Sequence, residues 1–215
     1  MSKSKENKGD EKLIRKKEWV SSKGLHGSDE LILNHPIMIK AQERIFQDFT
    51  PKNNIAFVSL CTSTRPYSKS RKWKKFIDEF SNVDFIISSN GGVVPIEYEN
   101  SYPYLTYDAH GQKAYDDLYR IYTTRNLIRF FILKKYQYII FNFRPTLRNN
   151  QAGKFSGQYL KRMKHIRDYV VAPSQTVYKR AAQDGFQRLG LSMFPDLHPI
   201  ILGDLHAYIK KFSGG

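Results

Sequence analysis

Cys61 is the only cysteine of the chain, and its surroundings are those of a reactive thiol. The apolar run Ile55–Leu60 before it predicts a buried strand of a parallel sheet. The polar residues after it predict a turn and then a helix over residues 71–80, capped by Ser68 or Ser70. Ligands of open α/β sheets bind outside the carboxyl ends of strands, and a helix N-terminus and nearby cations favour the thiolate form of cysteine. Those cations are Arg65, Lys69, Arg71 and Lys72. The alternative is a buried structural cysteine.

Residues 91–111 hold a second group of candidates, because this stretch is too long for an ordinary connection between elements. Gly91 and Gly92 can bring backbone N–H groups close to a ligand. Three carboxylates stand among the tyrosines of the stretch: Glu97, Glu99 and Asp108. In so basic a chain, such a cluster favours binding of a cationic group, or a base that takes a proton from an amine. The alternative interpretation is ordinary surface salt bridging.

These residues come without a recognisable metal or cofactor motif. His110 is the only histidine near the acidic cluster and no tight spacing of metal ligands occurs, so we expect no metal site. The chain has no phosphate-binding loop or dinucleotide glycine motif, so we expect no cofactor. One cysteine fits a reducing cytoplasm. Since no stretch approaches the roughly 20 apolar residues that span a bilayer, we expect a soluble cytoplasmic protein with no membrane partner.

The 215 residues carry a formal net charge of +15, which predicts an anionic partner. Residues 1–24 are rich in lysine and poor in apolar residues, which predicts a disordered basic arm. Residues 144–188 combine many cations with few carboxylates and with interleaved aromatic residues, which predicts nucleic-acid binding by the folded domain. The predicted contacts are Arg144, Arg148, Lys154, Lys161, Arg162, Lys164, Arg167, Lys179 and Arg180.

The order of the elements predicts the fold. We expect strands over residues 55–60, 83–88, 138–143 and 169–172, and helices over residues 36–48, 71–80, 113–135, 156–164, 175–189 and 204–212. Residues 91–111 are expected to be irregular. Strands that alternate with helices are typical of a parallel sheet covered on both faces. The sequence therefore predicts a single three-layer α/β domain over residues 25–215, with a mainly parallel sheet of about four strands flanked by helices.

The residues around Cys61 resemble the signature of the catalytic core of the archaeosine synthase family, archaeal enzymes that modify tRNA. That signature is Pro-Cys, three residues, Lys-Pro-Tyr, two residues, Ser, two residues, His. The matching residues are Cys61, Pro66, Tyr67 and Ser70, whereas Leu60, Arg65 and Trp73 stand where the family has Pro, Lys and His. Arg65 preserves the positive charge, but Trp73 does not supply the acid–base chemistry of a histidine.

A second stretch is similar to the family segment that follows the second core strand. It runs from Ser88 to Pro95 and continues through Glu97, Glu99, Tyr107 and Asp108. The resemblance covers about residues 55–143. The transglycosylase-like module and the C-terminal RNA-binding domain of full-length family members have no counterpart in this chain, so separate subunits are expected to supply them.

The resemblance implies a reaction in which the side-chain amine of free lysine adds to the nitrile of 7-cyano-7-deazaguanine in tRNA. Cys61 would form a thioimide with the nitrile carbon, and a radical enzyme partner would later cleave the adduct to archaeosine. Arg65, Tyr67 and Ser70 would orient the base, and Glu97, Glu99 or Asp108 would hold the lysine. The remaining implied substrate-binding residues are Pro66, Gly91, Gly92, Pro95 and Tyr107. Two alternatives are the same chemistry on deazaguanine in DNA and a non-catalytic tRNA-binding subunit.

Overall fold

A computed structural model of the protein describes residues 26–27, 34–89, 91–106, 108–109, 117–146 and 148–214. The predicted basic arm, residues 1–24, lies outside the described residues. Within the described part, no helix is long and apolar enough to cross a membrane.

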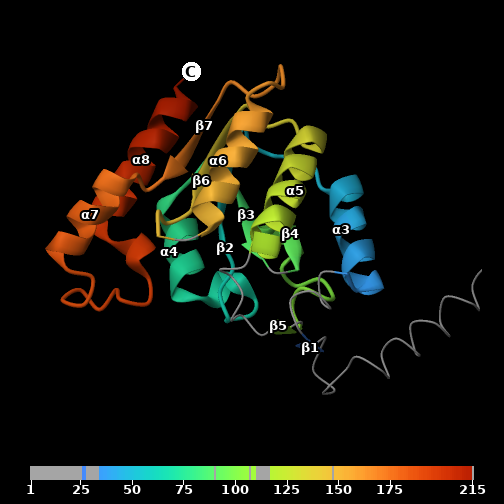
Figure 1. Cartoon of the computed structure of the whole chain (residues 1–215), viewed down its shortest axis with the longest axis horizontal. Coiled ribbons are helices and arrows are strands. Elements are labelled where there is room, and N and C mark those ends of the chain that lie inside the picture. Colours follow the sequence, from blue (N-terminus) through green and yellow to red (C-terminus); the bar gives the residue numbers. More distant parts are fainter. Residues whose placement is uncertain are drawn as a thin grey trace, which may run out of the picture.

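Five strands form the main sheet in the order β4-β3-β2-β6-β7 (Figure 1). Four of them are parallel, and β4 pairs with β3 in the antiparallel sense. The strands are β2 (Ile55–Leu60), β3 (Asp84–Ser89), β4 (Gly92–Pro95), β6 (Tyr138–Asn142) and β7 (Asp168–Ala172). Two short strands, β1 (His26–Gly27) and β5 (Asp108–Ala109), form a separate parallel pair. The predicted mainly parallel sheet is confirmed.

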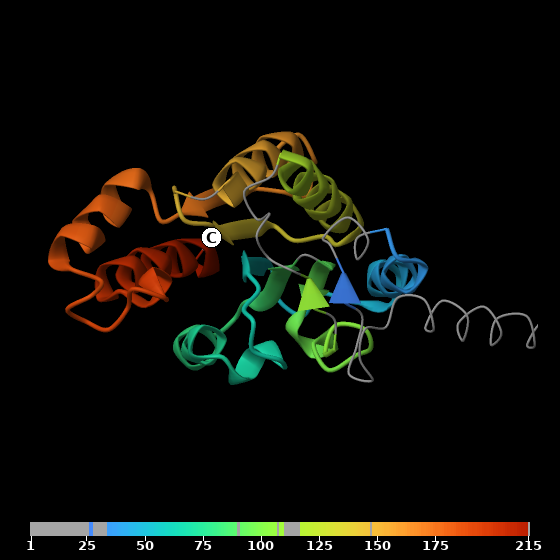
Figure 2. The same cartoon turned by 60° about the horizontal axis from the view of Figure 1, so that its bottom comes forward.

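Helices cover both faces of this sheet, as predicted. They are α3 (Pro36–Asp48), α4 (Arg71–Glu79), α5 (Asp117–Leu133), α6 (Arg148–Leu160), α7 (Gln175–Asp184) and α8 (Pro199–Ser213). Figure 2 shows α4 and α8 on one side of the sheet and α5 and α6 on the other. Aromatic contacts join the layers, because Phe57 of β2 meets Phe76 of α4 with ring centroids 5.1 Å apart. On the opposite face, Phe131 of α5 meets Phe141 of β6 at 6.0 Å.

The strand order creates a topological switch point between β2 and β6. From β2 the chain passes through α4 to β3 on one side, whereas β6 pairs with the other side of β2. Parallel neighbours at such a point diverge into connections on opposite faces, which opens a crevice at their carboxyl ends. Cys61 directly follows β2, and Arg144 comes two residues after β6. The fold therefore brings these two residues to the same edge of the sheet.

The prediction that residues 91–111 are irregular is wrong. This stretch contains β4 and the 3₁₀ helix η2 (Ile96–Tyr98). The sequence signal for β4 is weak because the strand has four residues and ends in Pro95, a residue that cannot donate to a ladder. Since β4 adds an antiparallel strand at the edge, the main sheet has five strands rather than about four.

The ends of three helices also differ from the prediction, and one of them is α7, which ends at Asp184 rather than near residue 189. The structure places α6 at Arg148–Leu160 rather than 156–164, and α8 begins at Pro199 rather than near residue 204. His198 explains the early start of α8, because its Nδ1 accepts a hydrogen bond from the N–H of Ile200 at 3.3 Å. Histidine is not among the favoured N-cap residues, so the sequence carries no clear start signal there.

Candidate active site at the carboxyl ends of β2 and β6

Cys61 lies at the carboxyl edge of the sheet and is partly exposed. Its N–H donates to the carbonyl oxygen of Ser88 at 2.9 Å, which continues the pairing between β2 and β3 by one residue. This bond fixes the backbone of Cys61, so the position of the thiol is set by the sheet itself rather than by a loose loop.

The turn after Cys61 packs into the core around two of the predicted catalytic residues. Tyr67 is fully buried, and the guanidinium of Arg65 lies 4.2 Å from the centre of its ring. Arg65 Nη1 also donates to the carbonyl oxygen of Thr62. Pro66 stands between them at the start of the 3₁₀ helix η1 (Tyr67–Lys69). The charge of Arg65 is thereby held within the turn that follows Cys61, by a cation–π contact and a backbone carbonyl.

The sequence predicted either Ser68 or Ser70 as the N-cap of this helix, and Ser70 is the N-cap of α4. Its Oγ accepts a hydrogen bond from the N–H of Trp73 at 3.2 Å, and the residue is buried. Trp73 is fully buried against Phe76 and Phe85, with ring centroids 6.0 Å and 6.3 Å away. The structure thus gives Ser70 a capping role and gives Trp73 a place in the core.

Glu97 and Glu99, two of the three predicted carboxylates, have different hydrogen-bond partners. Glu99 is buried and accepts hydrogen bonds from the N–H and the hydroxyl of Ser68, on the Cys61 side of the sheet. Glu97 pairs with Lys52 at 2.9 Å, close to the start of β2 and therefore at the opposite edge. The backbone of Asp108 lies in β5, and its side chain is outside the described part of the chain, as is all of Tyr107.

The side chain of Gln42 on α3 holds the segment that contains Gly91 and Gly92 through hydrogen bonds. Its amide group exchanges two hydrogen bonds with the backbone of Val93, at 2.8 Å and 2.6 Å, and donates a third to the hydroxyl of Tyr104 at 3.1 Å. Gly92 has φ +119°, and a Cβ atom on it would lie 2.2 Å from Gln42 Oε1. Gly91 donates its N–H to Ser89 Oγ at 3.1 Å, and Pro95 is buried opposite Ile86. Close packing against Gln42 therefore explains why glycine is needed at residue 92.

A buried charged cluster that the sequence analysis did not single out as a site lies beside Cys61. Lys72 Nζ donates to the carbonyl oxygen of Leu60 at 2.9 Å and lies 3.8 Å from Asp196 Oδ2. The Lys72 and Asp196 side chains are only 5% and 4% exposed. Arg144 Nε approaches the other oxygen of Asp196 at 3.4 Å. Asp196 belongs to the 3₁₀ helix η4 (Pro195–Leu197), far from Cys61 in sequence.

Burial lowers the pKa of Lys72 below its usual value. The charge of Asp196 acts against this lowering, that of Arg144 adds to it, and that of an ionised Cys61 again opposes it. A negative charge at Cys61 would therefore favour the protonated form of Lys72. One signal for Lys72 was present in the sequence, because it falls on the buried side of α4 next to Trp73.

Two polar residues from neighbouring strands complete the buried face behind Cys61. Asn142 at the end of β6 donates from Nδ2 to Ser59 Oγ at 3.2 Å, and both residues are buried. The Oδ1 atom of Asn142 has no hydrogen-bond partner among the described residues. A buried amide oxygen without a donor is costly.

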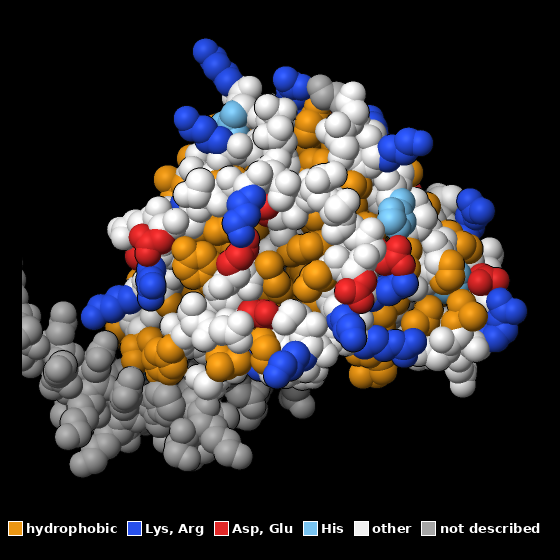
Figure 3. All heavy atoms as spheres, turned by 180° about the vertical axis from the view of Figure 1, so that it is seen from behind, with side chains coloured by type: hydrophobic (Ala, Val, Ile, Leu, Met, Phe, Trp, Pro, Cys, Tyr) orange, Lys and Arg blue, Asp and Glu red, His pale blue; other side chains and the backbone are white. Residues whose placement is uncertain are grey.

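The residues predicted to contact nucleic acid do not form one surface. Arg144 belongs to the buried cluster, and the side chain of Arg148 is outside the described part. The segment between α6 and β7 lies at the amino edge of the sheet and carries Lys161, Arg162, Lys164 and Arg167. Lys179 and Arg180 lie on α7, which follows the carboxyl end of β7, and Lys154 lies on α6. In the view from behind, lysine and arginine side chains are spread around the outline of the molecule (Figure 3).

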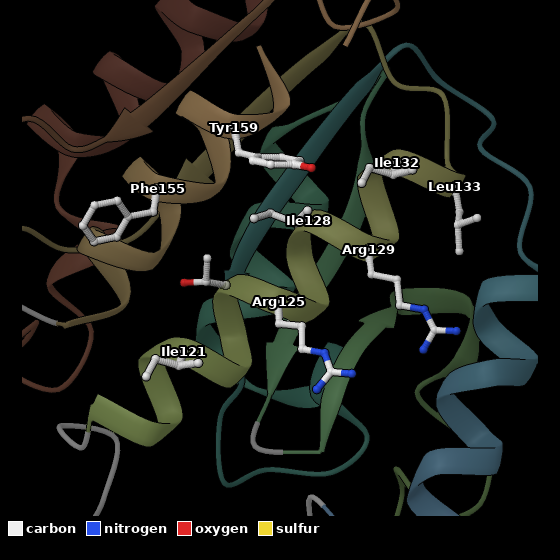
Figure 4. A pocket seen from close by; sticks show the side chains of 9 residues that line it. Ile121, Arg125, Ile128, Arg129, Ile132, Leu133, Phe155 and Tyr159 are labelled. Atoms are coloured by element: carbon white, nitrogen blue, oxygen red, sulfur yellow. The ribbon is translucent and has the colours of Figure 1, made fainter. Parts of the chain in front are cut away.

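An apolar hollow lies elsewhere, on the outer faces of α5 and α6 (Figure 4). Its volume is about 680 Å³, and its walls are mainly apolar, with Ile121, Ile128 and Ile132 from α5 facing Phe155 and Tyr159 from α6. It holds no thiol, carboxylate or imidazole among the described residues. This hollow therefore lacks the groups for covalent or acid–base catalysis, and the candidate active site is the edge around Cys61 and Lys72.

Comparison with known proteins identifies the family to which the domain belongs. Residues 38–179, about two thirds of the chain, match the model of a family described as a domain of unknown function, DUF5591. The chain belongs to this family. A curated relative, archaeosine synthase subunit alpha of Thermoplasma acidophilum, is 30% identical over 82 residues, which cover 35% of this chain and 16% of the relative. The chain therefore aligns with a small part of that longer protein.

One solved structure is also similar. It is a crystal structure of AF0587, a protein of unknown function, with a TM-score of 0.46 and 17% sequence identity. The match covers 62% of this chain and 43% of the other. Among the described residues of the present structure, no group of three or more histidine, cysteine or acidic side chains is arranged to hold a metal ion.

Proposed function

We propose that this DUF5591 chain modifies tRNA as an archaeosine-synthase-like transferase, with Cys61 as its nucleophile. The observation that carries the proposal is the position of a partly exposed thiol at the switch point of the sheet, beside the buried cation of Lys72. Similarity to archaeosine synthase subunit alpha supports the substrate class. The substrate would be a tRNA that carries 7-cyano-7-deazaguanine, and the second substrate would be free lysine.

The proposed reaction has two balanced steps. The Cys61 thiolate adds to the nitrile carbon, a C–S bond forms, and the nitrile nitrogen takes up one proton to give a thioimide. The neutral side-chain amine of lysine then adds to the same carbon, and one amine proton moves to the imide nitrogen. The C–S bond breaks, and the thiolate leaves with the protonated amidine as product. Covalent capture divides one difficult addition into two easier ones. Arg65, held within the turn that follows Cys61, would stabilise the charge that develops on the nitrile nitrogen.

Cationic side chains near the carboxyl edge would contact the tRNA backbone. Lys179 and Arg180 follow the carboxyl end of β7, and Lys69 and Arg71 flank the turn after Cys61. Phosphate contacts from such residues supply affinity that falls with salt. The modified base would have to leave its stack to reach Cys61. A radical enzyme and separate RNA-binding or transglycosylase subunits are the further partners of this proposal.

One observation favours a second function, that of a non-catalytic tRNA-binding subunit. Trp73 occupies the place of the family histidine and is fully buried among Phe76 and Phe85. No acid–base side chain therefore stands at that position. The same chemistry on deazaguanine in DNA is a third alternative, which differs only in the polymer bound.

Transfer of isotope-labelled lysine to nitrile-bearing tRNA tests these functions. Wild type and Cys61→Ala are compared, with nucleosides measured by mass spectrometry and tRNA binding measured in parallel. We expect a gain of one lysine mass that requires Cys61, with binding unchanged by the substitution. Salt-sensitive tRNA binding without any transfer would support the binding subunit, and transfer only to nitrile-bearing DNA would support the third alternative.

A further inference from the structure

The cluster behind Cys61 contains more positive than negative side chains. Lys72 and Arg144 share the single carboxylate of Asp196, at 3.8 Å and 3.4 Å. Lys72 and Asp196 are more than nine-tenths buried, whereas the Arg144 side chain is 27% exposed. A buried cation that lacks a full counter-charge is destabilising. The site is therefore completed by one further negative charge close to Lys72.

Cys61 can supply that charge. Lys72 Nζ donates a hydrogen bond to the carbonyl oxygen of Leu60 at 2.9 Å, so the ammonium group is fixed at the residue directly before Cys61. Ionised Cys61 is one of the charges that favour the protonated form of Lys72. At the neighbouring strand end, the buried side chain of Asn142 donates to Ser59 Oγ, while its Oδ1 has no hydrogen-bond partner among the described residues.

We propose that Lys72, held in place by Asp196, is a positioning residue that keeps Cys61 in its thiolate form. This inference deepens the proposed function and rests on it for the role of Cys61 as nucleophile. Lys72 acts through Cys61 and need not touch the substrate. Lys72 and Asp196 would together favour the thiolate, as a helix N-terminus or neighbouring cations do at other reactive cysteines.

Charged groups on the turns and helices around the site remain in the test, and all of them but Asp196 are common to every variant. They are Arg65 on the turn after Cys61, Arg144 after β6, Asp196 in η4, and the pair of His198 and Asp184, whose Nε2 and Oδ2 atoms are 3.1 Å apart. Lys72 is the cation of α4 that donates a hydrogen bond to Leu60, the last residue of β2. Its removal is therefore expected to change the thiol more than the loss of any surface cation on α4.

Alkylation of Cys61 by iodoacetamide tests the proposal without any nucleic acid. Because Cys61 is the only cysteine, its rate is read directly by mass spectrometry between pH 5.5 and pH 9.5. Lys72→Met should lower the rate at pH 6.5 by about tenfold and move the midpoint of the pH profile up by about one unit. Lys72→Arg should restore most of the rate, and Lys74→Met, an exposed neighbour on α4, should leave the profile unchanged.

An unchanged profile in Lys72→Met would overturn the proposal. If this variant does not melt like the wild type, the double variant Lys72→Met/Asp196→Asn removes both members of the buried pair, and the same two outcomes apply. A shifted profile together with no lysine transfer would refute the proposed function alone. Transfer that needs Cys61, together with an unshifted profile, would refute the role of Lys72 alone.

Discussion

Glu99 and Ser68 join the two loops that the sequence analysis singled out separately. The carboxylate of Glu99 accepts hydrogen bonds from the N–H of Ser68 at 2.8 Å and from its hydroxyl at 2.6 Å. Ser68 lies in η1, after Cys61, and Glu99 follows η2. Both oxygens of this buried carboxylate are therefore used to hold the Cys61 loop, which identifies Glu99 as a structural support of the site.

Glu99→Ala should lower the free energy of unfolding by about 1–3 kcal/mol, because two donors of Ser68 lose their acceptor in a buried setting. Glu97→Ala is the matched control, since its pair with Lys52 is at the surface, where ion pairs contribute little. Urea denaturation measures both variants. Equal denaturation midpoints for the two would show that the bonds to Ser68 do not stabilise the fold.

Gly92→Ala should be more destabilising than an ordinary glycine substitution. A Cβ atom at residue 92 would meet Gln42 Oε1 at 2.2 Å, and φ is +119°. Backbone strain and overpacking together are expected to cost about 2–4 kcal/mol of stability. Gly190→Ala is the control, because Gly190 also has positive φ, +64°, but has nothing within 4 Å of its Cβ position, and about 1 kcal/mol is expected.

Thermal unfolding of both glycine variants and of Gly92→Ala/Gln42→Ala separates the two causes. Removing the Gln42 side chain takes away the clash but also the three hydrogen bonds that it makes to Val93 and Tyr104. The effects of the two single substitutions should therefore add to more than the effect of the double variant. Strict additivity would mean that Gln42 does not restrict residue 92.

Elements whose sequence signal is local were predicted well. The structure has α3 at the predicted residues 36–48 and β2 at the predicted residues 55–60, because strong apolar patterns end there at clear turn residues. β4 was missed because its four residues form a strand only when β3 offers a partner. An N-cap or an apolar run can be recognised within one short segment of sequence. A pairing between two strands cannot, because it depends on a second segment.

The same contrast applies to the candidate site. Cys61, Arg65 and Ser70 are close in sequence, and their shared turn could be predicted from local chemistry. Asp196 lies 135 residues after Cys61, and it reaches Lys72 only because the segment before α8 folds back over α4. Of this cluster, the sequence analysis expected Lys72 near Cys61, as one of four cations on the turn and helix that follow. Its partner could not be identified without the tertiary structure.

Ionisation of Tyr136 should make the protein less stable in alkaline solution. Its hydroxyl donates to Asp84 Oδ2 at 2.8 Å, and burial raises the pKa of Tyr136 well above its ordinary value, helped by the charge of Asp84. The folded state thus keeps this proton when the unfolded chain has lost it. The stabilising contribution is complete below about pH 10 and is lost as the pH rises above it, by at most about 1.4 kcal/mol per pH unit.

Tyr136→Phe checks this sign. The variant should be less stable than wild type at pH 7, where Asp84 loses a buried donor, and the difference should shrink between pH 10 and pH 11. Urea denaturation at these pH values gives the difference directly, because titrating lysines are common to both proteins. A difference that stays constant with pH would mean that Tyr136 ionises as readily in the folded state as in the unfolded chain.

Asp204→Asn should stabilise the protein at neutral pH. Burial raises the pKa of Asp204, and its Oδ2 has no hydrogen-bond partner among the described residues. A raised pKa means that the folded state holds the proton more tightly, so this contribution is present below about pH 3.8 and is lost as the pH rises. At pH 7 the ionised carboxylate opposes folding, and a neutral amide of the same shape removes that effect. Because solvent screens the partly exposed group, the expected gain is about 0.5 kcal/mol, vanishing near pH 3.

Asp78→Asn, an exposed acidic residue on α4, is the control and should leave the denaturation midpoint unchanged at both pH values. A loss of stability in Asp204→Asn at pH 7 would show that the carboxylate has a favourable partner in the folded protein.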